Sequence, residues 1–270
     1  MNTLYQHLAG ESIGDALVRI ETDIKARPAD ADLRAAFVQF LILSGNWTRA
    51  LTQLKSWLAL KPQAKPTVTL LEQSIQGELQ RAKVMAGEAR PSMPETQWPW
   101  LTALAAALNE NGARAQALRL TALEHAAASA GQLVDENDQT QTFEWLMDGD
   151  ARLGPVCETL VNGRYFWLPF NAIEEIRFQA PASVTDLVWR HALVRLSDGT
   201  EQVCQIPARY PFAADASDAV KLGRMTEWLP LDGDGTLYEG IGQKAWLSEQ
   251  SESPLLSLSL VTFVTDGADE

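Results

Sequence analysis

Hydrophobic positions follow two different periods along this chain, and the change comes near residue 131. Before it, apolar residues recur at helical spacing, as in Ile13–Leu17–Ile20–Ile24, Leu33–Phe37–Phe40–Leu41 and Leu51–Leu54–Leu58. Turn sequences such as "ARPAD", "SGNW" and "LKPQAKP" separate these runs. The first half is therefore predicted to consist of helices joined by short turns.

A repeat of 34 residues lies inside this helical half. "ALVRIETDIKARP" ends at Pro28 and "ALTQLKSWLALKP" ends at Pro62. The spacing is that of a tetratricopeptide repeat, in which each unit is a pair of helices. Val38 and Trp57 stand where that repeat prefers small residues. The pattern therefore predicts a tetratricopeptide-like domain with atypical helix packing.

After Gly131 the period falls to two, which is typical of strands. Asn162-Gly163 and Asp198-Gly199 each join two strand-like runs and predict two-residue hairpins. Further strands are expected at "IEEIRF", "TEWLPL", "QKAWL" and "LSLVTFV", and one short helix at "FEWLM". The predicted fold is α+β, with a tetratricopeptide-like α-helical domain over residues 1–136 and a mainly antiparallel β domain over residues 137–270.

The aromatic stretch "GRYFWLPF" has two interpretations, a platform that stacks a ligand or a part of the core. In a strand, residues 165 and 167 face one way and residues 166, 168 and 170 the other, so both faces are apolar. This pattern favours a strand covered on both sides, and so a structural role.

The segment from Asp32 to Ser44 carries more apolar residues than one buried stripe needs. Either this helix is buried on both sides, or part of it lines a groove for another helix. The second hypothesis places Arg34, Val38 and Ile42 against a partner, with Trp47 as an aromatic anchor. Trp47 could equally seal the turn between two helices.

Charge is unevenly distributed along the 270 residues, whose net charge is −13. Residues 1–136 carry 13 Lys/Arg against 14 Asp/Glu, and residues 137–270 carry 9 against 21. The acidic half argues against a nucleic-acid partner. The sequence shows no signal peptide and no apolar run of 18 residues, so a soluble cytoplasmic protein without a membrane partner is expected. A surplus apolar helix also allows a homodimer.

Several chemical motifs are tempting, but their context does not fit. "GESIG" resembles a nucleophile elbow around Ser12, yet no strand precedes it, and Ser12 fits better as a helix cap. "DGDGTLYE" lacks the spacing of a calcium loop. Nucleotide-binding motifs and zinc-ligand spacing are absent, and Cys157 and Cys204 are expected to be buried reduced thiols. We therefore expect no catalytic residue, no metal and no cofactor.

One long motif resembles a known family. "FEWLMDGDARLGPVCETLVNGRYFWLPF", together with "ELQRAKVMAGEARP", "TDLVWRHALVRLSDGTE", "ARYP" and "KLGRMTEW", is similar to the ImpE/SciE family, also called TagJ. The resemblance implies a non-enzymatic adaptor of type VI secretion. Its partner would be the N-terminal helix of the small subunit of the contractile sheath, with a link to the AAA+ ATPase that recycles the sheath.

Two other functional classes stay open beside the adaptor. One is a tetratricopeptide-like scaffold or co-chaperone for an unrelated protein, and the other is a hydrolase. The motif "DGDARLGP" also has two interpretations. Asp148 and Asp150 either pair with Arg152 and Arg164 to join the two halves, or they form an acidic edge that binds a partner.

Overall fold

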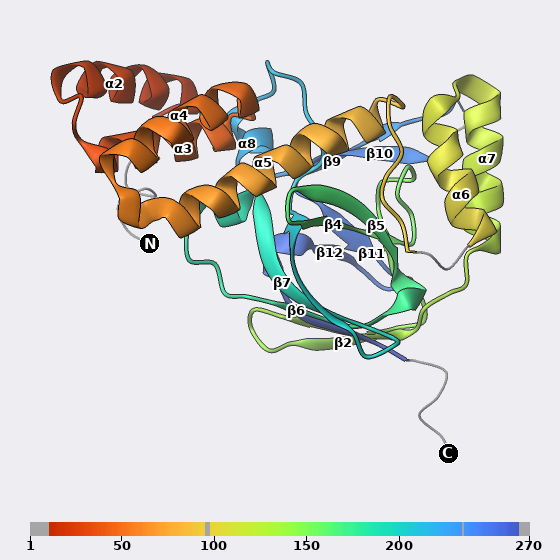
Figure 1. Cartoon of the computed structure of the whole chain (residues 1–270). Helices are drawn as coiled ribbons and strands as arrows, with labels where there is room; N and C mark the ends of the chain where they lie inside the picture. Colours follow the sequence, from red (N-terminus) through yellow and green to blue (C-terminus); the bar gives the residue numbers. More distant parts are fainter. Residues whose placement is uncertain (1–10, 95–97, 234, 265–270) are drawn as a thin grey trace.

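Paired helices form the first half of the molecule (Figure 1). The structure is a computed structural model that describes residues 11–94, 98–233 and 235–264. The helices are α2 (Ile13–Ala26), α3 (Ala31–Leu43), α4 (Trp47–Leu60), α5 (Lys65–Met85), α6 (Pro99–Ala106) and α7 (Gly112–His125). Helices α2 and α4 begin 34 residues apart, and so do α3 and α5. The predicted repeat period is confirmed.

Polar side chains cap the amino ends of α2, α3 and α4. The Ser12 hydroxyl accepts a hydrogen bond from the Asp15 backbone N–H at 3.0 Å, so Ser12 is the cap of α2. Asp30 caps α3 in the same way, and Asn46 caps α4. The capping role of Ser12 is confirmed, and Gly10 of the elbow-like motif lies outside the described residues.

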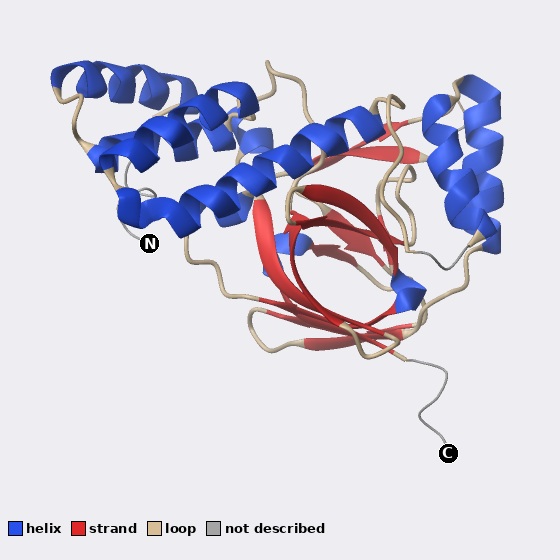
Figure 2. Cartoon of the chain, in the orientation of Figure 1, coloured by secondary structure: helices blue, strands red, loops and turns tan. Residues whose placement is uncertain are grey.

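The second half is built on an antiparallel sheet of eight strands (Figure 2). Its order is β2-β1-β13-β6-β7-β8-β4-β5, so the last strand of the chain lies inside the sheet. These strands are β1 (Gly131–Asp135), β2 (Thr140–Phe143), β4 (Val156–Val161), β5 (Arg164–Pro169), β6 (Ile173–Phe178), β7 (Trp189–Leu196), β8 (Glu201–Pro207) and β13 (Leu258–Phe263). The α+β fold class is confirmed.

Smaller elements complete the second half. They are β3 (Met147–Asp148), β9 (Thr226–Pro230), β10 (Tyr238–Gly242), β11 (Ala245–Leu247), β12 (Glu252–Pro254) and the short helix α8 (Asp218–Lys221). Asn162 and Gly163 have φ angles of 49° and 80°, as the predicted hairpin turn between β4 and β5 requires.

Two expectations near the change of period are wrong. "FEWLM" forms no helix, because Phe143 ends β2 and packs against Phe263 with ring centroids 5.8 Å apart. The predicted domain boundary after residue 136 falls within the β1–β2 hairpin at the edge of the sheet. Its residues look polar because an edge hairpin buries only part of its side chains. The sheet therefore begins at Gly131.

The helices and the sheet share one hydrophobic core. Helix α5 crosses the sheet, and Tyr165 and Trp167 of β5 lie in the same buried cluster as residues of α2 to α5. Phe170 lies in a second cluster on the other side, where it contacts Trp246. The stretch "GRYFWLPF" is therefore part of the core on both of its faces, as the alternation predicts.

Candidate functional site

The residues predicted to line a groove on α3 are only partly available. Val38 and Ile42 have no exposed surface, because α3 is apolar on most sides and packs among α2, α4 and the segment 184–187. The hypothesis that Val38 and Ile42 contact a partner is wrong, and the alternative of a helix buried on both sides holds. A helix that is apolar on most sides would expose a large hydrophobic surface to water if it lay at the outside of the molecule.

Arg34 and Trp47 occupy different surroundings. The Arg34 guanidinium donates to Oε1 of Gln53 at 2.6 Å and so ties α3 to α4. The half-buried Trp47 ring lies 5.8 Å from the ring of Trp189 in β7, measured between centroids. Trp47 thus contacts the sheet half and keeps part of its surface open.

The four residues expected to join the two halves do not act as one group. Asp150 pairs with Arg152, whose guanidinium also reaches Glu239 at 2.6 Å. Arg164 contacts neither aspartate and instead approaches Ser92 and stacks on Phe166. Both aspartates are buried, which also excludes an exposed acidic edge.

The distance along the hairpin explains why Arg164 is not part of this group. Arg164 lies beside the turn of the β4–β5 hairpin, whereas Asp148 and Asp150 lie near its open end at Val156. Strand β4 has six residues between these points, which is about 20 Å at the usual rise of a strand. An ion pair across that span is not possible.

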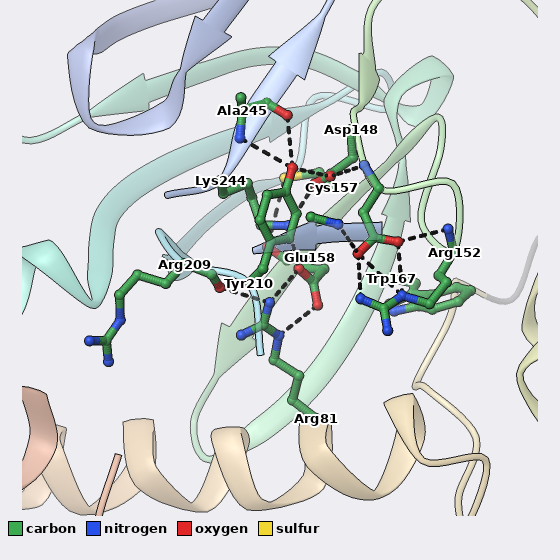
Figure 3. Close-up of polar contacts among 12 residues, drawn as sticks. Arg81, Asp148, Arg152, Cys157, Glu158, Trp167, Arg209, Tyr210, Lys244 and Ala245 are labelled. Atoms are coloured by element: carbon green, nitrogen blue, oxygen red, sulfur yellow. Dashed lines mark hydrogen bonds and ion pairs between the residues drawn. The ribbon is translucent and has the colours of Figure 1, made fainter. Parts of the chain in front are cut away.

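A different set of charges joins the helices to the sheet (Figure 3). We call it the junction network, and its members are Arg81, Asp148, Glu158, Tyr165, Tyr210 and Lys244. Glu158 of β4 lies at its centre and accepts two hydrogen bonds from Arg81 of α5, at 2.7 and 2.9 Å. The Tyr165 hydroxyl also donates to Glu158. The Arg81–Glu158 ion pair fixes α5 on the sheet.

Lys244 extends the network to the motif "DGDARLGP". Its ammonium lies 2.6 Å from a carboxylate oxygen of Asp148 and 2.6 Å from one of Glu158. The Tyr210 hydroxyl donates to the other oxygen of Asp148 at 2.8 Å. Asp148 thus joins the network through Lys244 and not through an arginine.

Burial and neighbouring charge set the protonation of this network. Burial acts to raise the pKa of Glu158, but Arg81 and Lys244 outweigh it and hold that pKa well below its usual range. Burial raises the pKa of Asp148 to about 6, with Lys244 opposing the change and Glu158 adding to it. Glu158 is therefore a permanent anion at neutral pH, and Asp148 gains a proton in mild acid.

The network is suited to holding the structure together and not to chemistry. The side chains of Arg81, Glu158 and Lys244 are at most 4 % exposed and are paired with one another. Cys157 beside them is a free buried thiol whose pKa is raised by burial. Among the described side chains, no group of three His, Cys, Asp or Glu could hold a metal ion.

Arg209 lies next to the network but is paired differently. It is 2 % exposed, and its guanidinium donates to the backbone carbonyls of Leu43 and Lys221. Leu43 ends α3, so Arg209 covers the carboxyl end of that helix. Burial lowers the pKa of Arg209 to about 9; Glu78 opposes this change, and the charge of Arg81 adds to it.

A cavity of about 580 Å³ opens at the junction between the two halves. We call it the junction cavity. The α3–α4 turn, α5 and the segment that follows β8 surround it, and its lining includes Trp47, Arg81, Arg209 and Phe212. It is larger than a side-chain void and lies where the repeats meet the sheet, so it is the candidate site for a ligand or partner.

Sequence patterns gave weak signals for this site. Glu158 and Lys244 each stand within an apolar strand-like run, in "VCETLV" and "QKAWL". An isolated charge at such a position indicates a buried partner of opposite charge. The sequence alone did not say which residue that partner is, and Arg81 and Arg209 were missed because their partners are far away in the chain.

Comparison with known proteins gives the family. The ImpE protein family model matches residues 140–262, which run from β2 into β13. The chain is 36% identical over 256 residues to the type VI secretion system accessory component TagJ of Pseudomonas aeruginosa (strain PAO1), covering 93% of this chain and 87% of that protein. This chain belongs to the ImpE family.

A solved structure agrees with the fold of this ImpE family member. The crystal structure of protein VPA1032 from Vibrio parahaemolyticus superimposes with a TM-score of 0.86 at 25% identity, and all of both chains is covered. The resemblance seen in the sequence is thus confirmed at the level of family and fold. Within the described ranges, no helix has both the length and the hydropathy that crossing a membrane requires.

Proposed function

We propose that this ImpE family member is a cytoplasmic, non-enzymatic adaptor of a type VI secretion system. It binds the N-terminal helix of the small sheath subunit and assists sheath handling together with the AAA+ recycling ATPase. The observation that carries the accessory role is the 36% identity to a type VI secretion system accessory component over nearly the whole chain.

The architecture supports binding of a helix. Paired helices with open grooves commonly bind an amphipathic helix, through contacts spaced at i, i+3, i+4 and i+7. Because Val38 and Ile42 are buried, the face of α3 does not offer such a groove. The junction cavity does offer apolar surface, and Trp47 keeps its proposed role as an aromatic anchor there.

The test is isothermal titration of the full chain with a synthetic peptide of the small sheath subunit's N-terminal helix, taken from the same secretion gene cluster. A second peptide, with the apolar positions of that helix replaced by serine, is the control. Saturable binding of the first peptide and none of the second is expected. Equal heats from both peptides, or no binding of either, would refute the adaptor hypothesis.

The link to the ATPase is tested separately. Analytical ultracentrifugation of the chain, the purified ATPase and their mixture measures whether they bind directly. A faster-sedimenting complex in the mixture is expected. The run on the chain alone also gives its oligomeric state, and so tests the predicted possibility of a homodimer.

A further inference from the structure

The ionisable side chains around the junction cavity are unlike the rest of the molecule. Its lining holds three cations, Arg81, Arg209 and Lys221, and one carboxylate, Glu78. The chain as a whole has a net charge of −13. A cavity with more cations than anions attracts a negatively charged group, whereas the acidic surface of the rest of the molecule repels it.

Arg209 is a buried cation whose charge is not matched by a carboxylate among the described residues. Arg81 is neutralised by Glu158, and the Glu78 carboxylate accepts from the Trp189 indole and lies 3.4 Å from Arg81. Among the described residues, Arg209 makes no ion pair within 4.0 Å, and its Nε has no hydrogen-bond partner. Figure 3 shows its side chain pointing away from Glu158.

Arg209 covers the carboxyl ends of α3 and α8, and these contacts give its charge no carboxylate partner. The carbonyls at the carboxyl ends of α3 and of the short helix α8, to which Arg209 donates, carry partial negative charge but no full counter-charge. A buried charge is costly unless it is paired. The observed contacts therefore leave room for a carboxylate close to Arg209.

The walls of the cavity limit what that carboxylate belongs to. Trp47, Leu17 and Phe212 are apolar, and the Arg209 guanidinium stacks on the Phe212 ring at 4.9 Å. Lys221 is half-buried at the same cavity and makes no ion pair with any described residue. An amphipathic segment with an acidic residue beside apolar ones matches both the walls and the charge.

We propose that the junction cavity receives an acidic side chain of the docked helix, which contacts Lys221 and is held by the positive potential of Arg209. Neighbouring apolar side chains of the helix pack on Trp47 and Phe212. This inference rests on the proposed function and adds the place and the charge that determine recognition.

Two adjacent alanines allow the cavity to be blocked with a matched control. Ala214 is exposed and lines the junction cavity, whereas Ala213 is exposed and lines a neighbouring cavity with Arg152 and Glu239. Ala214→Trp should lower the affinity for the sheath peptide by about tenfold or more, because the tryptophan side chain fills the cavity without touching the core. Ala213→Trp should leave affinity within about twofold of wild type.

The charge is tested by a double-mutant cycle in the same titration. One partner is Lys221→Gln, and the other is a peptide set in which each acidic residue is changed singly to its amide. For wild type, one of these amide peptides should bind about three- to tenfold more weakly than the parent peptide. For Lys221→Gln, the same amide peptide and the parent peptide should bind equally well. The salt dependence of affinity should also fall in Lys221→Gln.

The outcomes separate this inference from the proposed function. Wild-type binding with equal affinities for Ala214→Trp and Ala213→Trp would overturn the cavity assignment and leave the adaptor role intact. If, for every amide peptide, the losses of affinity caused by the peptide change and by Lys221→Gln simply add, no acidic residue contacts Lys221, and the proposed contact is overturned. No binding of the parent peptide to wild type would overturn the adaptor role, and this inference with it.

Discussion

Glu158→Gln is the substitution that tests most directly whether the junction network joins the two halves. It preserves the size of the side chain but removes the charge that faces Arg81 and Lys244. One oxygen of the carboxylate becomes an amide NH₂, which would point a donor at Arg81 or at Lys244. Both cations are buried, with side chains 4 % and 1 % exposed, so water cannot replace the lost anion.

The size of the effect follows from this burial. Removing one partner of a buried ion pair leaves an unpaired charge and costs about 3–5 kcal/mol. Lys244 keeps Asp148 at 2.6 Å, and Arg81 keeps Glu78 at 3.4 Å, so the lower end of that range is expected. A loss of about 3 kcal/mol is a large part of the roughly 5–15 kcal/mol that stabilises a typical domain.

Urea unfolding, followed by circular dichroism and by tryptophan fluorescence, measures this loss. Glu174→Gln is the control, because Glu174 pairs with Arg195 at 3.1 Å on the surface, where both side chains are more than a third exposed. That change should cost less than about 1 kcal/mol. Glu158→Gln should shift the midpoint to lower urea, while the two optical signals still change together.

A double replacement checks the reasoning from the opposite direction. Arg81→Met combined with Glu158→Leu removes both charges, and most of the lost stability should return, because apolar pairs of similar volume often replace buried ion pairs without cost. A loss below about 1 kcal/mol for Glu158→Gln would refute the assignment of the network as the link between helices and sheet.

Two further predictions concern protonation. The pKa of Asp148 is raised to about 6 in the folded state, so folding takes up a proton between about pH 6 and 4; lowering the pH from 7 to 5 should add about 1 kcal/mol of stability from this group. Asp148→Asn should lack that increment when urea unfolding is compared at the two pH values, and an unchanged increment would contradict the assignment. Cys157 and Cys204 should not react with a thiol reagent in the native chain, because both are buried and burial raises both pKa values, that of Cys204 to about 12. Both should react in guanidinium, and rapid reaction of either thiol without denaturant would show that the core opens.

Local signals predicted most of the secondary structure. Helical spacing, caps such as Ser12 and the 34-residue repeat identified α2 to α5, because these features depend on neighbours in the chain. The two-residue hairpin at Asn162-Gly163 was equally readable, since Val161 pairs with Arg164. The hairpin at Asp198-Gly199 was placed correctly, but its loop has three residues and not two, because the Leu196 N–H donates to the Thr200 carbonyl. The β1–β2 hairpin was not, because its polar residues look the same as those of a linker.

The site was hard to predict because its contacts are long-range. Arg81 and Glu158 are 77 residues apart, and the carbonyl of Leu43 and Arg209 are 166 apart. A sequence pattern shows that a charge such as Glu158 is out of place in a strand, but it does not show its partner. The groove hypothesis failed at Val38 and Ile42 for the related reason that the segment 184–187, far away in the chain, packs on α3 together with α2 and α4.

The position of β13 has a consequence for how this chain is made. This strand pairs with β1 on one side and β6 on the other. During synthesis, therefore, the β1–β2 hairpin has no neighbour in the sheet until residues 258–263 leave the ribosome. The repeats can form early because their contacts are local, whereas the underside of α5 waits for its sheet. We expect ribosome-bound chains to expose the apolar side chains of the β1–β2 hairpin, such as Leu133 and Phe143, and chaperones to protect them until β13 emerges.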